Sequence, residues 1–94
     1  MNTYLIAFTL RMVEGRDPDR FPLAIQERVD PYAKDLSPST WIVRTNVDAD
    51  EILNLLRDEL VPGDKLAVIL LPVGVKFASE GLAEHEKQYL IITS

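Results

Sequence analysis

Apolar runs alternate with polar segments along the chain, and each run has the length of one secondary-structure element. Residues 3–10 are β-branched, aromatic or aliphatic almost throughout, which predicts a strand inside a sheet, covered on both faces. Residues 39–45 and 65–71 also have the composition of strands. A short edge strand of mixed polarity is predicted over residues 32–37, and a Ser-Pro pair supplies the turn after it.

Two further segments have the spacing of amphipathic helices. Phe21, Ile25 and Val29 recur every four residues and mark one face of a first helix, which ends before the next proline. A second helix follows Asp48, which resembles the first residue of a capping box with Glu51. A Val-Pro-Gly sequence ends this helix, and its apolar positions are Ile52, Leu53, Leu56 and Leu60.

The pattern is less regular after the third long strand, where a proline and a glycine interrupt it. Val75 and Phe77 alternate with polar or small residues, as in a further short strand. Residues 80–87 are polar and predict a loop or a single helical turn. Residues 89–93 are mostly apolar and predict a final strand.

The element order predicts an α+β, ferredoxin-like β-α-β-β-α-β fold with one or two extra C-terminal strands, an antiparallel sheet with two helices on one face. One domain over residues 1–94 is expected, with residues 71–94 as a C-terminal extension. The other sheet face would expose Leu5, Ala7 and one alternating set of the strand over residues 65–71. A second copy of the chain is the simplest cover, so we expect a homodimer. The same strand lies at an edge, where we expect the C-terminal strand to pair with it, within the chain or across the dimer.

Composition and charge narrow the class of protein. The 94 residues are 47% hydrophobic and carry 15 acidic against 10 basic side chains, a net charge of −5. The basic residues are dispersed, which disfavours nucleic-acid binding by a monomer. The absence of cysteine excludes disulfides and zinc–thiolate sites. No apolar run reaches 18 residues and no basic, cleavable leader is visible, so we expect a cytoplasmic protein with no membrane partner.

Three stretches resemble one known family: residues 1–10 (MNTYLIAFTL), 39–45 (STWIVRT) and 64–69 (DKLAVI). In order and spacing they are similar, over about residues 1–71, to the small ferredoxin-like CRISPR-associated proteins. Within these, the chain looks like the minor, non-integrase subunit of the CRISPR adaptation complex and its stand-alone relatives outside CRISPR loci. The Ser-Thr-Trp-hydrophobic strand is the most specific part of the resemblance, which implies a dimer.

The resemblance also implies where a metal would bind. In that family the first strand ends in Tyr-Asp-hydrophobic, and the Asp residues of two protomers are proposed to bind one divalent metal for phosphodiester hydrolysis. The matching triplet here is Phe8-Thr9-Leu10, so Thr9 occupies the carboxylate position. A threonine hydroxyl is a poor ligand for magnesium or manganese. We therefore expect a non-catalytic dimeric interaction or assembly module that needs no cofactor and contacts another protein through its sheet edge.

The alternative is a divalent-metal-dependent endonuclease of RNA or DNA with a rearranged acidic site. Its Mg²⁺ or Mn²⁺ would be held by Glu14, Asp17 and Asp19, although these positions are more typical of a solvated loop and a helix cap. The only histidine, His85, lies between two glutamates that share no strand or helix face with it, which favours a solvated segment. Trp41 favours packing in a core or dimer face over base stacking. A third hypothesis is a ferredoxin-like domain that binds a small ligand between sheet and loops.

Overall fold

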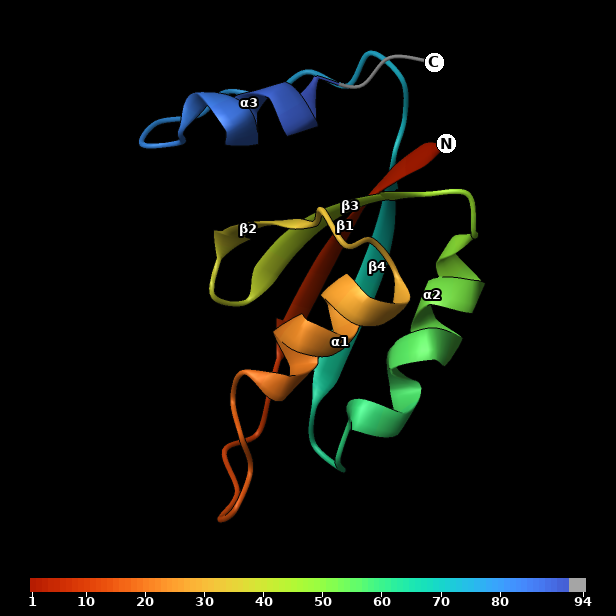
Figure 1. Cartoon of the computed structure of the whole chain (residues 1–94), viewed down its shortest axis with the longest axis vertical. Coiled ribbons are helices and arrows are strands. Elements are labelled where there is room, and N and C mark those ends of the chain that lie inside the picture. Colours follow the sequence, from red (N-terminus) through yellow and green to blue (C-terminus); the bar gives the residue numbers. More distant parts are fainter. Residues whose placement is uncertain (92–94) are drawn as a thin grey trace.

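The computed structural model describes residues 1–91, which form a four-stranded antiparallel sheet with helices on both of its faces (Figure 1). The strands, in the spatial order β2-β3-β1-β4, are β1 (Asn2–Thr9), β2 (Lys34–Ser37), β3 (Thr40–Thr45) and β4 (Lys65–Leu71). Two helices, α1 (Arg20–Arg28) and α2 (Ala49–Leu56), pack on one face, and a single 3₁₀ turn, η1 (Arg57–Glu59), extends α2. The predicted ferredoxin-like α+β arrangement is confirmed.

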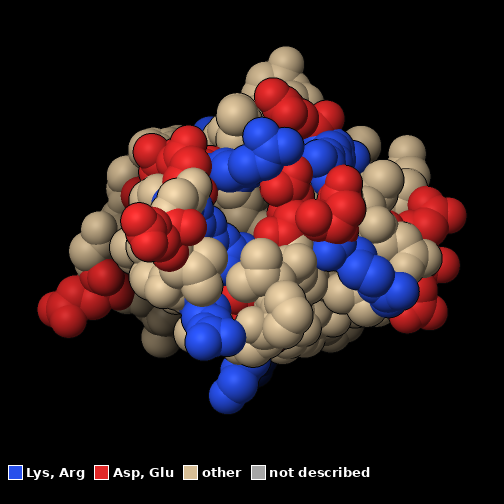
Figure 2. Space-filling view, turned by 90° about the horizontal axis from the view of Figure 1, so that it is seen from below, with Lys and Arg blue, Asp and Glu red and all other residues tan. Residues whose placement is uncertain are grey.

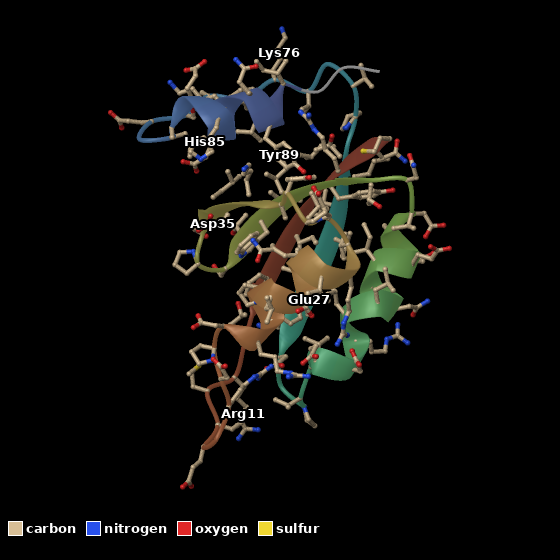
Figure 3. All side chains as sticks on the ribbon, in the orientation of Figure 1. Arg11, Glu27, Asp35, Lys76, His85 and Tyr89 are labelled. Atoms are coloured by element: carbon tan, nitrogen blue, oxygen red, sulfur yellow. The ribbon has the colours of Figure 1, made fainter. Side chains whose placement is uncertain are left out.

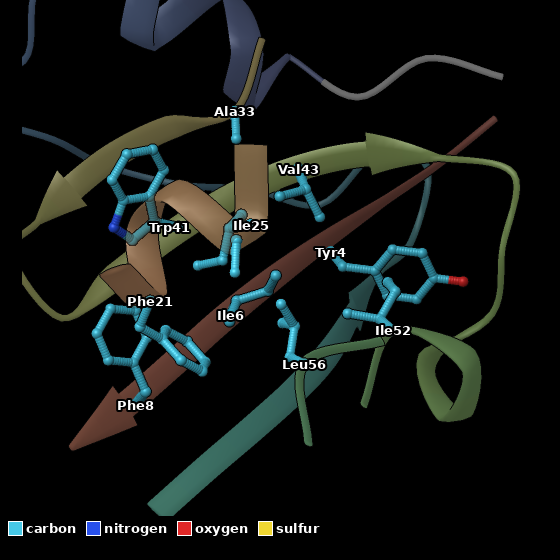
Figure 4. Close-up of a cluster of buried hydrophobic side chains, with 11 residues drawn as sticks. Tyr4, Ile6, Phe8, Phe21, Ile25, Ala33, Trp41, Val43, Ile52 and Leu56 are labelled. Atoms are coloured by element: carbon cyan, nitrogen blue, oxygen red, sulfur yellow. The ribbon is translucent and has the colours of Figure 1, made fainter. Parts of the chain in front are cut away.

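Strand β1 lies in the centre of the sheet because it is apolar along most of its length. Tyr4, Ile6 and Phe8 point toward α1 and α2 and are at most 7% exposed. On this same face Ile6 lies opposite Trp41 of β3 and opposite Val68 of β4. The other buried members of this cluster are Phe21, Ala24, Ile25, Ala33, Trp41, Val43, Ile52 and Leu56 (Figure 4).

The predicted helix boundaries follow from local chemistry. Helix α1 begins at Arg20, which places Pro22 in the first turn, where a missing N–H costs no intrahelical hydrogen bond. The Asp48 carboxylate accepts the backbone N–H of Glu51 at 2.9 Å, so Asp48 is the N-cap of α2 as predicted. The same helix ends at Leu56, short of the predicted Leu60, because residues 57–59 tighten into η1.

The predicted C-terminal strands are wrong within the described residues. Val75 and Phe77 lie in a turn and an irregular segment, with the Val75 N–H donating to the Pro72 carbonyl at 3.1 Å. Residues 84–87 form the first turn of helix α3 (Glu84–Leu90), in line with the helical alternative predicted for residues 80–87, but the helix continues over the start of the predicted final strand. A Glu86 carboxylate oxygen accepts the Ala83 N–H at 3.1 Å and satisfies the first turn of this helix. Positions 92 and 93 of that predicted strand lie outside the described residues.

The strand register defines the sheet face that turns away from α1 and α2. Leu5 lies opposite Ile69, and Ala7 lies opposite Ala67. Antiparallel partners point to the same face, so the odd-numbered residues of β4 share the open face with Leu5 and Ala7. Ile69 is 48% exposed there. Strand β4 is also an edge strand, as predicted, and within residues 1–91 no C-terminal strand pairs with it.

Helix α3 covers another part of this open face, at β3. The Arg44 guanidinium lies 4.5 Å from the centre of the Tyr89 ring and donates to the backbone carbonyls of Gln88, Tyr89 and Ile91. Ile42, on the same face of β3, is fully buried. Figure 1 shows α3 apart from α1 and α2, near the upper end of the sheet. The chain's own C-terminal segment thus covers part of the face for which a second copy was predicted.

Candidate functional site

The residue in the family's metal-binding position, Thr9, is exposed at the end of β1. The predicted substitute acids lie in the segment that follows. Glu14 is exposed in a turn, and the Asp17 carboxylate accepts the backbone N–H of Asp19 at 2.9 Å just before α1. Among residues 1–91, no three acidic or histidine side chains are grouped so that they could hold a metal ion. The structure therefore joins Asp17 to Asp19 but assembles no three-ligand centre with Glu14.

The Glu-His-Glu triplet lies in the first turn of α3. His85 is exposed there, and Figure 3 labels its place on α3. Both glutamates accept hydrogen bonds close to them in the chain: Glu84 from the Gln88 side chain at 3.3 Å, and Glu86 from the Ala83 backbone. The triplet thus serves the local structure of a short helix.

An ion pair between Arg16 and Asp64 was not predicted from the sequence. Arg16 Nη2 lies 2.7 Å from Asp64 Oδ2, and Nη1 lies 2.9 Å from Oδ1. The Asp64 side chain is 1% exposed and also accepts the backbone N–H groups of Arg11 and Val61. The hydrogen bond from Arg16 is the main reason that the pKa of the Asp64 carboxyl lies well below its usual range. This pair fastens the loop after β1 to the loop before β4.

A second ion-pair network joins α1 to η1. Arg28 donates to Asp58 at 2.6 Å and to Glu59 at 2.9 Å, and Arg20 donates to the other Glu59 oxygen at 2.9 Å. The lower end of the molecule in Figure 1 accordingly presents interleaved acidic and basic side chains (Figure 2). These arginines are engaged with acids of the same chain, and they do not form a separate basic patch.

A pocket of about 620 Å³ opens where the end of β1, the β2–β3 turn and the start of α1 meet. Its walls are mainly apolar and include Phe8, Leu10, Met12, Pro18, Pro22 and Pro38. Thr9 and Ser39 add hydroxyl groups, and in this described lining only Asp19 and Asp35 carry charge. The structure thus places two sequence-predicted residues, Thr9 and Asp19, at a pocket whose described lining holds no group of three metal-ligating side chains.

Trp41 contributes to the wall of this pocket from β3 and is 8% exposed. Its predicted packing in the core is confirmed. Over residues 1–91, its indole Nε1–H is the buried side-chain group that has no hydrogen-bond partner. In Figure 4 the indole nitrogen lies on the ring edge that turns away from Ile25, on the side of the β2–β3 turn. Buried donors are nearly always paired in proteins, which makes this N–H an exception.

Asp35 is the pocket residue that sequence reasoning missed. It lies on β2 directly opposite Trp41, so both side chains occur on the same face of the sheet. The mixed polarity of residues 32–37 was a signal that one side of this edge strand is polar, but the sequence did not reveal its partner on β3.

No family model, curated protein or solved structure matches this chain. Kinship with the CRISPR-associated proteins therefore stays a prediction from the sequence. None of the helices in the described part of the chain has the length and apolar character needed to cross a lipid bilayer.

Proposed function

We propose that this protein is a non-catalytic, dimeric interaction or assembly module of the cytoplasm, a relative of the small CRISPR-associated ferredoxin-like proteins in which Thr9 replaces the metal-binding carboxylate. The observation that carries the proposal is the exposed apolar edge of the sheet at β4. There Ile69 is 48% exposed and Leu70 is 52% exposed, on opposite faces of one edge strand.

The backbone of β4 supports pairing with another chain. One side of the strand is hydrogen-bonded to β1, and the other is the end of the sheet. Unpaired strand edges with apolar side chains favour pairing between chains. Two β4 strands related by a two-fold axis would join two sheets into one and bring the Ile69 side chains of both copies toward each other.

The open face next to β4 supports the same interface. Leu5 and Ala7 are only partly buried, and Ala67 is exposed beside Ile69. Helix α3 covers the β3 side of this face through Arg44 and leaves the β4 side for a partner. A second copy paired along β4 would cover the part of this apolar surface that borders the edge, around Ile69, and removal of apolar area from water favours association.

Light scattering after size-exclusion chromatography tests the dimer. We expect twice the chain mass of 10.6 kDa for the natural sequence and a monomer for Ile69→Lys, because two charges would meet near the two-fold axis. Leu23→Lys is the matched control, since Leu23 is 51% exposed on α1, away from the edge. A monomer of the natural sequence at high concentration, or dissociation by Leu23→Lys alone, would contradict the proposal.

A nuclease assay separates this proposal from the endonuclease alternative. The purified protein is incubated with labelled single- and double-stranded RNA and DNA, with and without Mg²⁺ or Mn²⁺. We expect no cleavage, because Thr9 supplies no anionic ligand. Metal-dependent cleavage that is lost when Glu14, Asp17 and Asp19 are replaced by alanine would establish the alternative instead.

A further inference from the structure

We propose that the pocket at the end of β1 binds a small organic cation, with an apolar body in the pocket, an ammonium group at the Asp19 and Asp35 carboxylates and a carbonyl oxygen on the Trp41 indole N–H. This inference goes beyond the proposed dimer, which depends on β4 and the open face.

The carbonyl group of the proposed ligand is inferred from the indole N–H of Trp41. A buried donor without an acceptor is destabilising because it has lost its hydrogen bond to water, and the rest of the described chain satisfies its buried side-chain polar atoms. An indole N–H can only donate, so its missing partner must be an acceptor. Because Trp41 also lines the pocket, a molecule bound there is placed to supply that acceptor.

The apolar body of the proposed ligand is inferred from the side chains that line the pocket. Phe8, Leu10 and Met12 line one part of the pocket, and prolines on both sides of it add rigid apolar surface. The volume of about 620 Å³ lies within the usual range for small-molecule sites, roughly 300–1,000 Å³. Met12 is 69% exposed, and its flexible thioether can adjust to the shape of a ligand.

The positive charge of the proposed ligand is inferred from the carboxylates of Asp19 and Asp35. Asp19 and Asp35 are exposed, and neither side chain makes a hydrogen bond or ion pair with other residues in the 1–91 region. No basic residue belongs to the lining, and the nearby arginines Arg16 and Arg20 are already paired with Asp64 and Glu59.

The strand register brings the Asp35 carboxylate close to the Trp41 indole. Asp35 lies opposite Trp41 on the same sheet face, and Figure 3 shows Asp35 on β2 close to the turn that leads into β3. A cation at Asp35 would therefore lie beside the indole ring. The acidic lining and the net charge of −5 disfavour phosphates and other anions.

Trp41 provides a direct readout because it is the only tryptophan in the chain. The full-length, ¹⁵N-labelled protein is titrated with L-phenylalaninamide, which carries a phenyl ring, an ammonium group and a carbonyl. We expect a saturable shift of the single indole N–H resonance with a Kd on the order of 1 mM, typical of a ligand of this size. No shift of that resonance up to 20-fold this concentration would overturn the proposal.

Three related probes change the charge or the carbonyl group. N-acetyl-L-phenylalaninamide lacks the charge, phenethylamine lacks the carbonyl, and phenylacetate carries a negative charge. We expect the first two to bind at least about threefold more weakly, a difference typical of one exposed charge or hydrogen-bond contact, and phenylacetate to cause no saturable shift. Equal binding by all four probes would overturn the proposal in favour of unspecific apolar contact.

Matched variants locate the cation. Asp35→Asn and Asp19→Asn are expected to weaken L-phenylalaninamide binding about threefold each and to leave N-acetyl-L-phenylalaninamide unchanged. Asp50→Asn is the control, because Asp50 is exposed on α2 outside the pocket. An equal effect of all three variants would contradict the assignment. Repeating the titration with Ile69→Lys separates this result from the oligomeric state.

Discussion

The guanidinium of Arg16 and the carboxylate of Asp64 form a two-point hydrogen-bonded pair, with Nη1–Oδ1 and Nη2–Oδ2 distances of 2.9 and 2.7 Å. Arg16 also donates to the carbonyls of Arg11 and Glu59. One ion pair thereby positions the loop after β1, the end of η1 and the loop that leads into β4. The loop after β1 contributes Met12 and Pro18 to the pocket lining. By holding this loop in place, the ion pair also helps to position the pocket.

Asp64→Asn should destabilise the protein and make its free energy of unfolding less dependent on pH in the acid range. The pKa of Asp64 is lowered, chiefly by the hydrogen bond from Arg16, so its stabilising effect is complete above the unfolded pKa of about 3.9 and is lost as the pH falls toward the folded value. At pH 7 we expect the midpoint of thermal unfolding to fall by roughly 10 °C.

Urea denaturation at pH 7, 4 and 2.5 checks this sign. The natural sequence should lose more stability than Asp64→Asn between pH 4 and 2.5, so the two free energies of unfolding converge. Glu14→Gln, a change of an exposed carboxylate in the same loop, should behave like the natural sequence. Parallel pH curves for Asp64→Asn and the natural protein would refute the role given to this carboxylate.

Gly63→Ala should be more harmful than Gly74→Ala. Both glycines have positive φ values, +97° and +79°, which an alanine adopts only with strain. A Cβ at Gly63 would also lie 3.2 Å from Cδ of Arg11, whereas the space around Gly74 is open. We expect a loss of about 1–2 kcal/mol for Gly63→Ala and a smaller loss for Gly74→Ala, measured by urea denaturation. Equal losses would show that the Arg11 contact has no effect.

Ile6→Ala tests the core beneath the helices. Ile6 is fully buried at the centre of β1, and truncation would leave a cavity between the sheet and α1 and α2. We expect the free energy of unfolding to fall by about 3 kcal/mol. Leu23→Ala, at a position 51% exposed, should cost less than about 1 kcal/mol. Similar losses at the two positions would contradict the described packing.

Tyr89→Phe should loosen α3 without unfolding the sheet. The Tyr89 hydroxyl donates to the Asp30 carboxylate, which is nearly buried and also accepts the Arg44 N–H. Losing this hydrogen bond should speed amide hydrogen exchange in residues 84–90 about five- to tenfold, which corresponds to roughly 1 kcal/mol. Exchange in β1 should stay unchanged. Tyr32→Phe, at an exposed tyrosine, is the control. An equal effect of both changes would show that the Tyr89–Asp30 hydrogen bond does not hold α3 on the sheet.

The sequence predicted the four strands and the first two helices because their apolar spacing matches their burial. Leu5 and Ala7 were correctly placed on the open face, while the choice between the two faces of β4 required the register with β1. Helix α3 was missed because Tyr89, Leu90 and Ile91 form an apolar run typical of a strand. The helix is favoured by distant contacts with Arg44, which local sequence does not reveal.

The candidate pocket was less predictable than the fold for a similar reason. Trp41 was correctly assigned to packing, but its unpaired N–H depends on everything that surrounds the ring. The proximity of Asp35 to Trp41 requires the β2–β3 register, which shifts at an irregularity after Asp35. The Arg16–Asp64 pair joins residues 48 positions apart, and no local pattern marks such partners.

The central position of β1 has a consequence for biosynthesis. This strand leaves the ribosome before both of its neighbours, and its pairing with β4 requires synthesis up to Leu71. Until then the nascent chain carries an apolar strand with one bare side, a hazard for aggregation. A product that terminates after α2 would lack β4 and leave one side of β1 unpaired, so we expect it to aggregate and not to fold into a smaller form of this domain. The four-stranded sheet can form only after β4 has emerged.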